Sequence, residues 1–360
     1  MVLRGKDLTV EDLPVPEPGP GQVLAKVRAC GICGSDLHAA KYMDEMMAVA
    51  QRSGRRAWYE SEVSDNAGIV MGHEFVAEVV KAGPGAEQWQ PGTRVTSVPV
   101  LIAPESENGV LSIGYSPETP GAYSEYVVMS APMLLAVPDN VPDNVAATTE
   151  PCAVGLHAVR EAQMQPGETA LVMGAGPIGL MTLIWLKKEG ASFVAVSDFS
   201  AERRELAAKM GADLVLDPGK VNVAEELGKA LPPSTASRTF GTVTLPPAPD
   251  VVFEAVGVEG TLQQAMETVQ VRGRVVVVGV CMKPDTITPL LGINKQLTLK
   301  FVLGYTPAEY AEALQAFADG SVDTSPLVTR TVSIDELPAT FTALADPRDC
   351  KVVVLPHGKL

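Results

Sequence analysis

The chain has 360 residues, 46% of them hydrophobic and 20% charged, so it is long enough for about two domains with buried cores. This mixture excludes a disordered, collagen-like or low-complexity protein. The net charge of −15 argues against nucleic acid and anionic membranes as partners, because such an acidic surface repels phosphate groups. Five cysteines, an odd number, and a strand-like start at residues 1–10 in place of a secretory signal predict a reducing, cytoplasmic location.

The first part of the chain, to about residue 150, shows short strands separated by tight turns. Residues 22–29 alternate apolar and basic side chains, as a half-buried strand does. Similar apolar runs occur at Phe75–Lys81, Arg94–Val98 and Tyr123–Met129, and clusters of proline and glycine separate them. This spacing predicts a barrel-like or sandwich-like β domain.

From about Thr169 the pattern changes to an alternation of strands and helices. A β-branched run at Val275–Val278 is typical of a strand covered on both faces. Such an alternation predicts a parallel, doubly wound sheet. We expect strands at Thr169–Met173, Ser192–Ser197, Asp213–Leu216, Asp250–Glu254 and Arg274–Val280, and helices at Ile178–Glu189, Ala201–Met210 and Glu259–Val269.

The C-terminal part mixes both patterns, with a helix expected at Ala308–Ala318 and strands at Thr331–Ile334 and Val352–Leu355. A segment rich in proline, serine and threonine at 232–249 indicates a surface loop. We therefore expect an α/β protein in which a β-rich domain is interrupted by a nucleotide-binding domain. The predicted boundaries are 1–152 with 297–360 for the first domain and 153–296 for the second.

A glycine-rich motif lies between the first predicted strand and helix of the second domain. The segment Thr169–Leu186 contains no acidic residue or lysine and superficially fits a membrane span, but its glycine-rich centre fits G-x-G-x-x-G. Asp198 follows at the end of the next strand and would accept the ribose hydroxyls while repelling a 2′-phosphate, which favours NAD over NADP. Arg203 and Arg204 keep NADP as an alternative. The motif itself is Gly174-Ala175-Gly176-Pro177-Ile178-Gly179.

A second candidate site combines Cys33, His73 and an acidic third group. Sulfur, nitrogen and oxygen donors together suit Zn²⁺ with one coordination position open. Taken alone, the Cys30-x-x-Cys33 spacing is also compatible with a redox-active cysteine pair or with half of a zinc ribbon. Both of those interpretations are weak, since the chain has no second Cys-x-x-Cys and no helix is predicted to begin at Cys33.

Four motifs in order resemble the zinc-dependent medium-chain alcohol dehydrogenases, and the resemblance covers nearly the whole chain. It implies a GroES-like β-rich catalytic domain beside a Rossmann domain that binds NAD. It extends to residues 253–257 and 304–306. The motifs are Cys33-Gly34-Ser35-Asp36-Leu37-His38, Gly72-His73-Glu74-Phe75, Glu150-Pro151 with Gly155, and Gly174–Gly179.

The resemblance implies a catalytic zinc held by Cys33 and His73. The third ligand position matches Glu150, and an acidic residue there is similar to the sorbitol and threonine dehydrogenase branch. Cys152 is the rival third ligand. Glu74 would support the ligands from behind or exchange with one of them.

Two departures from the family stand out. Residues 97–120, where the family carries four cysteines for a structural zinc, contain none, so a single zinc is expected. The distance from Cys33 to His73 is also longer than relatives usually show, which marks residues 39–68 as an insertion. Trp58 and Tyr59 within it suggest either a wall of the substrate pocket or a surface used in assembly.

The implied chemistry is hydride transfer between NAD and a secondary alcohol, a polyol or a related alcohol/ketone pair, with zinc as Lewis acid. Ser35 matches the family's relay hydroxyl, and His38 matches the outer base that passes the proton to solvent. The alternative for Ser35 is a helix or turn cap, and the alternative for His38 is a solvated side chain without a catalytic role. Lys351 either approaches the pyrophosphate or is simply exposed. Further cofactor contacts are expected from Phe199, Ala255, Val256, Gly257, Val278, Gly279 and Val280.

Two other functions fit parts of this pattern. A metal-independent reductase of the same superfamily needs no ligands at Cys33, His73 and Glu150, and a cofactor-binding protein without catalysis needs neither Ser35 nor His38. The metal ligands and the relay residues argue against both. The expected partners are a small alcohol or ketone and further copies of the chain, as a homodimer or homotetramer.

Overall fold

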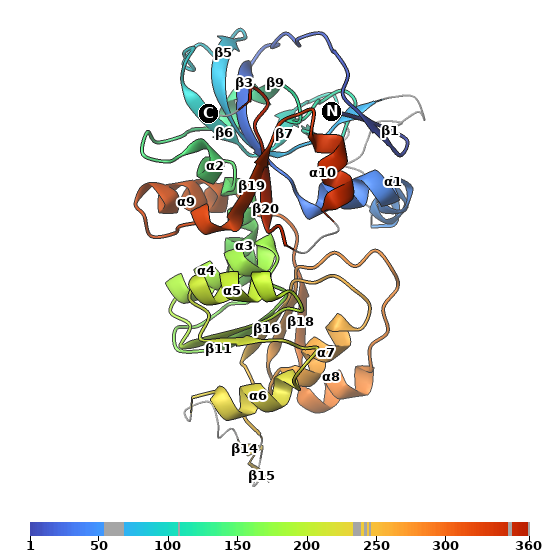
Figure 1. Ribbon diagram of the computed structural model, residues 1–360, viewed down its shortest axis with the longest axis vertical. Coiled ribbons are helices and arrows are strands. Elements are labelled where there is room, and N and C mark those ends of the chain that lie inside the picture. The colour runs from blue at the N-terminus through green and yellow to red at the C-terminus, as the bar shows by residue number, and fades with distance from the viewer. Residues whose placement is uncertain are drawn as a thin grey trace. The chain divides into compact units, whose positions relative to one another are not determined.

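The computed structural model describes residues 1–53, 68–106, 109–232, 239–240, 243–244, 246–344 and 348–358. The chain forms two compact units, one made of Met1–Glu150 with Tyr310–Leu360 and the other of Pro151–Glu309. Figure 1 shows them by colour: the first unit runs from blue to green and ends in red, and the second runs from green to orange. The boundaries fall inside helices α3 (Thr149–Glu161) and α9 (Pro307–Ala318).

A seven-stranded sheet forms the framework of the first unit. Its order is β10-β6-β5-β3-β20-β19, and β9 also pairs with β3. At the end of β3, Gly31 lies opposite both Glu74 of β5 and Val353 of β20, so three distant segments meet there. The strands are β3 (Gln22–Gly31), β5 (Glu74–Ala82), β6 (Arg94–Ser97), β9 (Tyr126–Ser130), β10 (Leu134–Ala136), β19 (Val328–Val332) and β20 (Lys351–Val354).

Smaller elements complete this unit. A three-stranded sheet has the order β2-β1-β4, and β7 pairs with β8. The strands are β1 (Val2–Arg4), β2 (Asp7–Thr9), β4 (Ile69–Val70), β7 (Val100–Ile102) and β8 (Val110–Ser112). The helices are α1 (Gly34–Arg52), α2 (Asp143–Ala146) and α10 (Leu337–Ala343), with short 3₁₀ turns at Ala131–Met133 and Ser325–Leu327.

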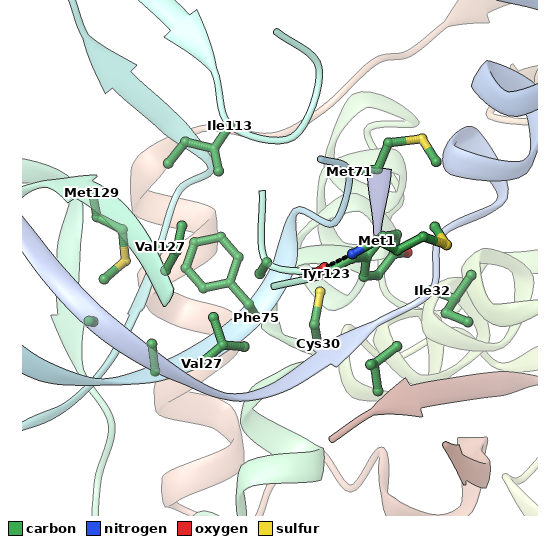
Figure 2. Packing of buried hydrophobic residues seen from close by; sticks show 14 of the residues in the cluster. Met1, Val27, Cys30, Ile32, Met71, Phe75, Ile113, Tyr123, Val127 and Met129 are labelled. Carbon is green, nitrogen blue, oxygen red and sulfur yellow. Dashed lines mark hydrogen bonds between the residues drawn. The ribbon is translucent and has the colours of Figure 1, made fainter. Parts of the chain in front are cut away.

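The core of the first unit follows from the alternation seen in the sequence. The apolar side chains of β3 are buried, whereas Lys26 and Arg28 are only partly buried. Figure 2 shows Phe75 and Val127 packed in this core, with the Met1 amine donating to the carbonyl oxygen of Tyr123 at 2.5 Å. Burial of such side chains is the main stabilising contribution to the sheet.

Helix α1 begins directly after Cys33, so the expectation that no helix starts there was wrong. The helix runs to Arg52, with non-helical backbone angles at Tyr42, and therefore takes in the first part of the predicted insertion. Met43 and Met46 pack against the core of the first unit. Trp58 and Tyr59 lie outside the described residues.

The second unit contains a six-stranded parallel sheet of order β13-β12-β11-β16-β17-β18. Helices α4 and α5 cover one face, and α6, α7 and α8 cover the other (Figure 1). The strands are β11 (Thr169–Met173), β12 (Phe193–Ser197), β13 (Leu214–Leu216), β16 (Val251–Glu254), β17 (Arg274–Val277) and β18 (Thr298–Phe301). The helices are α4 (Pro177–Lys188), α5 (Ala201–Lys209), α6 (Val223–Ala230), α7 (Thr261–Thr268) and α8 (Pro289–Lys295).

This sheet is the doubly wound arrangement that the sequence predicts. The C-terminal boundary of the second unit differs from the predicted boundary at residue 296. Strand β18 pairs with β17, so residues 297–309 belong to the second unit. Strand β17 ends at Val277, so residues 278–280 follow the strand. In the predicted loop at 232–249, the described residues include two short strands, β14 (Thr239–Phe240) and β15 (Val243–Thr244).

The apolar segment Thr169–Leu186 divides into β11 and the first part of α4. Helix α4 has 12 residues, whereas a membrane span needs about 20. Among the described residues, no helix is both long and apolar enough to cross a bilayer.

Candidate active site

Three side chains that sequence analysis singled out meet in the first unit. Cys33 immediately precedes α1, His73 precedes β5, and Glu74 opens β5. Their ligand atoms all lie within 4.8 Å of one another, and within the described ranges this is the one such group of three donors. The mixed thiolate, imidazole and carboxylate set is one that Zn²⁺ accepts.

Asp36 orients the imidazole of this cluster. Its Oδ1 lies 3.3 Å from Nδ1 of His73, which leaves Nε2 for a metal. Its Oδ2 accepts hydrogen bonds from the Tyr123 hydroxyl at 2.5 Å and from the Cys33 backbone N–H at 3.2 Å. A buried carboxylate behind a histidine is the usual support of a metal-bound imidazole. Sequence analysis missed Asp36 as a supporting group, although an acid three residues after Cys33 could have been recognised.

The charges of this pair are strongly coupled. Burial alone would lower the pKa of His73, but the charges of Asp36 and Cys33 raise that pKa well above its usual range. Burial alone would raise the pKa of Asp36, but the His73 ring and the Tyr123 hydroxyl lower it. A metal at Nε2 would displace the imidazole proton, so metal binding would release protons.

Glu74 is held by Lys351. The Lys351 ammonium donates to both carboxylate oxygens, at 2.8 and 2.7 Å, and to the Ile32 carbonyl at 2.9 Å. Both charged side chains are buried. Gly31 permits this arrangement, because a Cβ there would lie 2.1 Å from Oε2 of Glu74. Lys351 is therefore neither exposed nor part of a phosphate site, and both expectations for it were wrong.

Glu150 and Cys152 were the two candidates for the third ligand. Glu150 lies in the first turn of α3. Burial lowers the pKa of Lys351, whereas the charge of Glu74 and, less strongly, that of Glu150 raise it, so Glu150 lies near the cluster. It is not one of the three grouped donors. Cys152 is fully buried and accepts from the Trp185 indole N–H at 3.3 Å. Burial raises the pKa of its thiol to about 12, which opposes the thiolate that a metal needs.

The two expected relay residues lie on the first turns of α1. Ser35 is not the helix cap, because Cys33 occupies that position, and its Oγ is 2.6 Å from the hydroxyl of Tyr115. His38 is half-buried, and its Nδ1 has no hydrogen-bond partner among the described residues. Burial and the charge of Lys41 lower the pKa of His38, so the ring is neutral and able to accept a proton at neutral pH.

The glycine-rich turn of the second unit has the geometry of a dinucleotide site. Gly174 adopts φ of +93°, and a Cβ there would lie 2.9 Å from the Ala255 carbonyl oxygen. Gly176 caps α4, with Pro177 at its start, and a Cβ on Gly179 would lie 1.9 Å from the Gly174 oxygen. The three glycines thus let the chain turn sharply from β11 into a helix N-terminus that favours phosphate.

Asp198 and its neighbours lie at the carboxyl end of β12. The carboxylate accepts backbone N–H bonds from Ala175 and Ser200, each at 2.8 Å. Arg204 donates to the carbonyls of Asp198 and Phe199 and forms an ion pair with Asp217 at 3.0 Å. The expected loops at 255–257 and 278–280 follow strands β16 and β17. In the first of these loops, the Glu254 carboxylate accepts from the N–H groups of residues 256 and 257, each at 2.9 Å.

A group of metal-binding donors in one unit and a dinucleotide fold in the other define a metal-dependent dehydrogenase. Comparison with known proteins gives the family. Residues 19–139 match the alcohol dehydrogenase GroES-like domain, and residues 177–319 match the zinc-binding dehydrogenase family.

Curated relatives and solved structures agree with these matches. The chain is 32% identical to (R,R)-butanediol dehydrogenase of Bacillus subtilis, over 98% of this chain and 97% of that protein. It is 30% identical to sorbitol dehydrogenase of Bos taurus, over 98% of this chain and 95% of that protein. A zinc-binding dehydrogenase of Sinorhizobium meliloti bound to NADP has a TM-score of 0.81, 27% identity and coverage of 99% and 98%.

The chain belongs to the zinc-dependent medium-chain alcohol dehydrogenase family, and the resemblance inferred from its motifs is confirmed. It is an oxidoreductase of CH–OH groups that uses zinc and a nicotinamide cofactor. The expected fold class, a GroES-like domain with a Rossmann domain, is confirmed as well.

Proposed function

We propose that the protein transfers a hydride between NAD and a secondary alcohol or polyol, with one catalytic zinc per chain. The observation that carries this proposal is the buried cluster of Cys33, His73 and Glu74, supported by Asp36 and Lys351. The butanediol and sorbitol dehydrogenases among the relatives act on vicinal diols and polyols by name, which supports the same substrate class here.

The residues of the cluster fit zinc. Cys33 and His73 would hold it, and the grouping of their donor atoms with Glu74 favours Glu74 over Glu150 as the third ligand. Bound zinc would supply a Lewis acid that lowers the pKa of the substrate hydroxyl. Because Glu74 is already paired with Lys351, Glu150 stays the alternative ligand, and zinc content in the Glu74→Gln and Glu150→Gln variants decides between them.

Ser35 and His38 of α1 would transfer the proton of the substrate hydroxyl to solvent. Ser35 would accept it from the substrate hydroxyl, and His38 would take it onward to solvent from its half-buried position one turn later. A lowered pKa suits His38 to this task, because its ring is unprotonated at neutral pH. Asp36 stays ionised behind His73 and keeps the ring oriented.

NAD is favoured over NADP by the groups around Asp198. Each carboxylate oxygen accepts one backbone N–H, so lone pairs remain for the two ribose hydroxyls. Arg204 is engaged by Asp217 and two carbonyls, which argues against its use for a 2′-phosphate. Phe199 is 74% exposed and offers an aromatic face for the adenine.

The test combines metal analysis with a substrate panel. Purified protein should contain about one zinc per chain and reduce NAD with 2,3-butanediol or sorbitol far better than with ethanol. Two tightly bound zinc ions would contradict the single site. Equal activity without zinc would support the metal-independent reductase, and no activity with any alcohol would support a non-catalytic protein.

We also propose that the chain assembles as a homodimer or homotetramer. Strand β18 is an edge of the parallel sheet, and Phe301 and Leu303 on or beside it are each 66% exposed. Ile293 of α8 in the same unit is 70% exposed. An apolar edge strand of this kind is a ready surface for a second copy. Light scattering after size exclusion should give two or four chains, and a monomer would contradict the proposal.

A further inference from the structure

The cysteine-free segment at 97–120 supplies a side chain that sequence analysis did not identify. Tyr115 follows β8, and its hydroxyl lies 2.6 Å from Oγ of Ser35. Its ring also lies against the ring of His73, with centroids 5.2 Å apart and planes at 37°. Tyr115 is only 8% exposed. One tyrosine therefore contacts both a candidate zinc ligand and the expected relay hydroxyl.

Three glycines bring this segment beside His73. Gly114 adopts φ of +88°, and a Cβ there would lie 3.0 Å from the Gly72 carbonyl oxygen. A Cβ on Gly121 would lie 2.5 Å from the same oxygen. The N–H of Gly114 donates to the Thr119 carbonyl at 2.9 Å, which closes the loop that carries Tyr115. This close approach of the two backbone segments places Tyr115 next to His73.

The hydrogen bond to Tyr115 limits how Ser35 can act. A serine hydroxyl has one proton to donate and two lone pairs that accept, and it rotates unless a partner holds it. When the Ser35 proton points to Tyr115, both lone pairs stay available for the substrate hydroxyl. When Tyr115 donates instead, one lone pair and the Ser35 proton remain for the relay. In either case, Tyr115 determines where Oγ of Ser35 points.

We propose that Tyr115 is a positioning residue for the proton relay, acting through Ser35. The inference rests on the proposed function, since it needs Ser35 to accept the substrate proton. The ring and the hydroxyl of Tyr115 have separate roles: the ring packs on His73, and the hydroxyl orients Ser35. Burial of Tyr115 gives the proton no direct way to solvent there, so the onward path runs through His38.

The test is a double-mutant cycle of Tyr115→Phe and Ser35→Ala. Tyr115→Phe keeps the ring on His73 and removes only the hydroxyl. It should lower kcat for alcohol oxidation about three- to tenfold, as loss of one neutral hydrogen bond does, and leave KM nearly unchanged. The solvent deuterium isotope effect should rise, because proton transfer becomes slower. In the Ser35→Ala background, Tyr115→Phe should have no further effect.

Two controls separate positioning from a structural role. Zinc content should be the same in Tyr115→Phe as in the unmutated protein. Tyr126→Phe, which alters a tyrosine of the same unit whose ring meets that of His357 edge to face, should leave kcat unchanged. Loss of zinc in Tyr115→Phe would overturn the proposal and assign Tyr115 to the support of His73. An equal loss of kcat with and without Ser35 would overturn it too.

A crystallographic measurement keeps the inference independent of turnover. Crystal structures should show one Ser35 rotamer in the unmutated protein and a second rotamer in Tyr115→Phe. The same single rotamer in both proteins would overturn the positioning role. If the zinc-loaded protein oxidises no alcohol, the proposed function fails on that result, and the Ser35 rotamers still decide whether Tyr115 orients Ser35.

Discussion

The two candidate sites of this protein are assembled in different ways. In the second unit, the Ala175 N–H and the Asp198 carboxylate that accepts it are separated by only 23 positions along the chain. In the first unit, Lys351 and Glu74 are 277 positions apart, Tyr123 and Asp36 are 87 apart, and Tyr115 and Ser35 are 80 apart. The dinucleotide site lies at the ends of two consecutive strands, β11 and β12, whereas the metal cluster depends on long-range packing.

This difference predicts different consequences of mutation. A side chain of the dinucleotide site can be changed with little effect on folding, because Asp198 is partly exposed and accepts from backbone N–H groups instead of a buried charged side chain. The supports of the metal cluster are buried charges that lose their ion-pair partner when one residue of the pair is removed. Mutations at the metal cluster should therefore affect zinc binding and stability together, and those at Asp198 should affect mainly cofactor choice.

The largest effect should come from Cys33→Ser. Without the thiolate the zinc should be lost. Zinc as Lewis acid stabilises the charge that develops in the transition state by several kcal/mol, so kcat/KM should fall at least about a thousandfold. Zinc content by mass spectrometry and NADH formation measure this. Cys152→Ala is the control and should be far milder, because Cys152 is buried against Trp185. The reverse ranking would assign the metal to Cys152.

Next in size is the effect of Lys351→Met on stability. The change leaves the buried Glu74 carboxylate without its partner and should cost about 3–5 kcal/mol of unfolding free energy, measured by urea denaturation of the zinc-free protein. Lys81→Met is the matched control, since Lys81 pairs with Glu17 on the surface and should contribute less than about 1 kcal/mol. Equal losses of unfolding free energy in the two variants would show that the buried Lys351–Glu74 pair contributes no more to stability than a surface pair.

Asp198→Ala should change cofactor choice more than stability, although it removes the acceptor of two backbone N–H groups. Removing the ribose acceptors and the like charge should lower the NAD/NADP ratio of kcat/KM about tenfold to a hundredfold. The control is Asp213→Ala, which alters a carboxylate that binds Lys187 in the same unit and should leave the ratio unchanged. Native preference for NADP would instead indicate that Arg203 or Arg204 binds the 2′-phosphate.

The smallest effect concerns the pH dependence set by His38. Burial and the Lys41 charge lower the pKa of His38, and a protonated ring cannot accept the relay proton. Alcohol oxidation should therefore fall as the pH falls through that pKa, below the usual range of histidine. Lys41→Met should raise the pKa of His38 and move this acid limb to higher pH. A kcat/KM profile that does not move would exclude His38 as the base.

Several elements of the second unit could be predicted closely because each depends on nearby residues, although helices α6 and α8 were not predicted. Strand β11 has the predicted bounds, and α4 and α5 each lie within about one residue of prediction. The last strand of the sheet was harder to assign. Nothing near Thr298–Phe301 distinguishes a sixth parallel strand from a strand of the β domain, and only its pairing with β17 does so.

In the first unit, the motifs named Cys33, His73 and Glu74 but not how they are supported. The helix that begins after Cys33 was missed, because its first residues, Gly34 to Asp36, have low helix propensity. Lys351 was judged by its immediate neighbours on a late strand, where exposure is the usual outcome. Its position beside Glu74 follows from the antiparallel pairing of β20 with β3.

The sequence by itself determined the family, the dinucleotide turn and the presence of metal-binding residues, because these depend on residue types at short spacing. Tertiary structure alone decided that the donor atoms of Glu74 group with those of Cys33 and His73 while Glu150 does not, that Lys351 neutralises Glu74, and that Tyr115 contacts Ser35. The physical reason is that a buried charge or hydroxyl takes its partner from whatever the fold packs against it. In this protein, β20 and the Tyr115 loop supply those partners from distant parts of the chain.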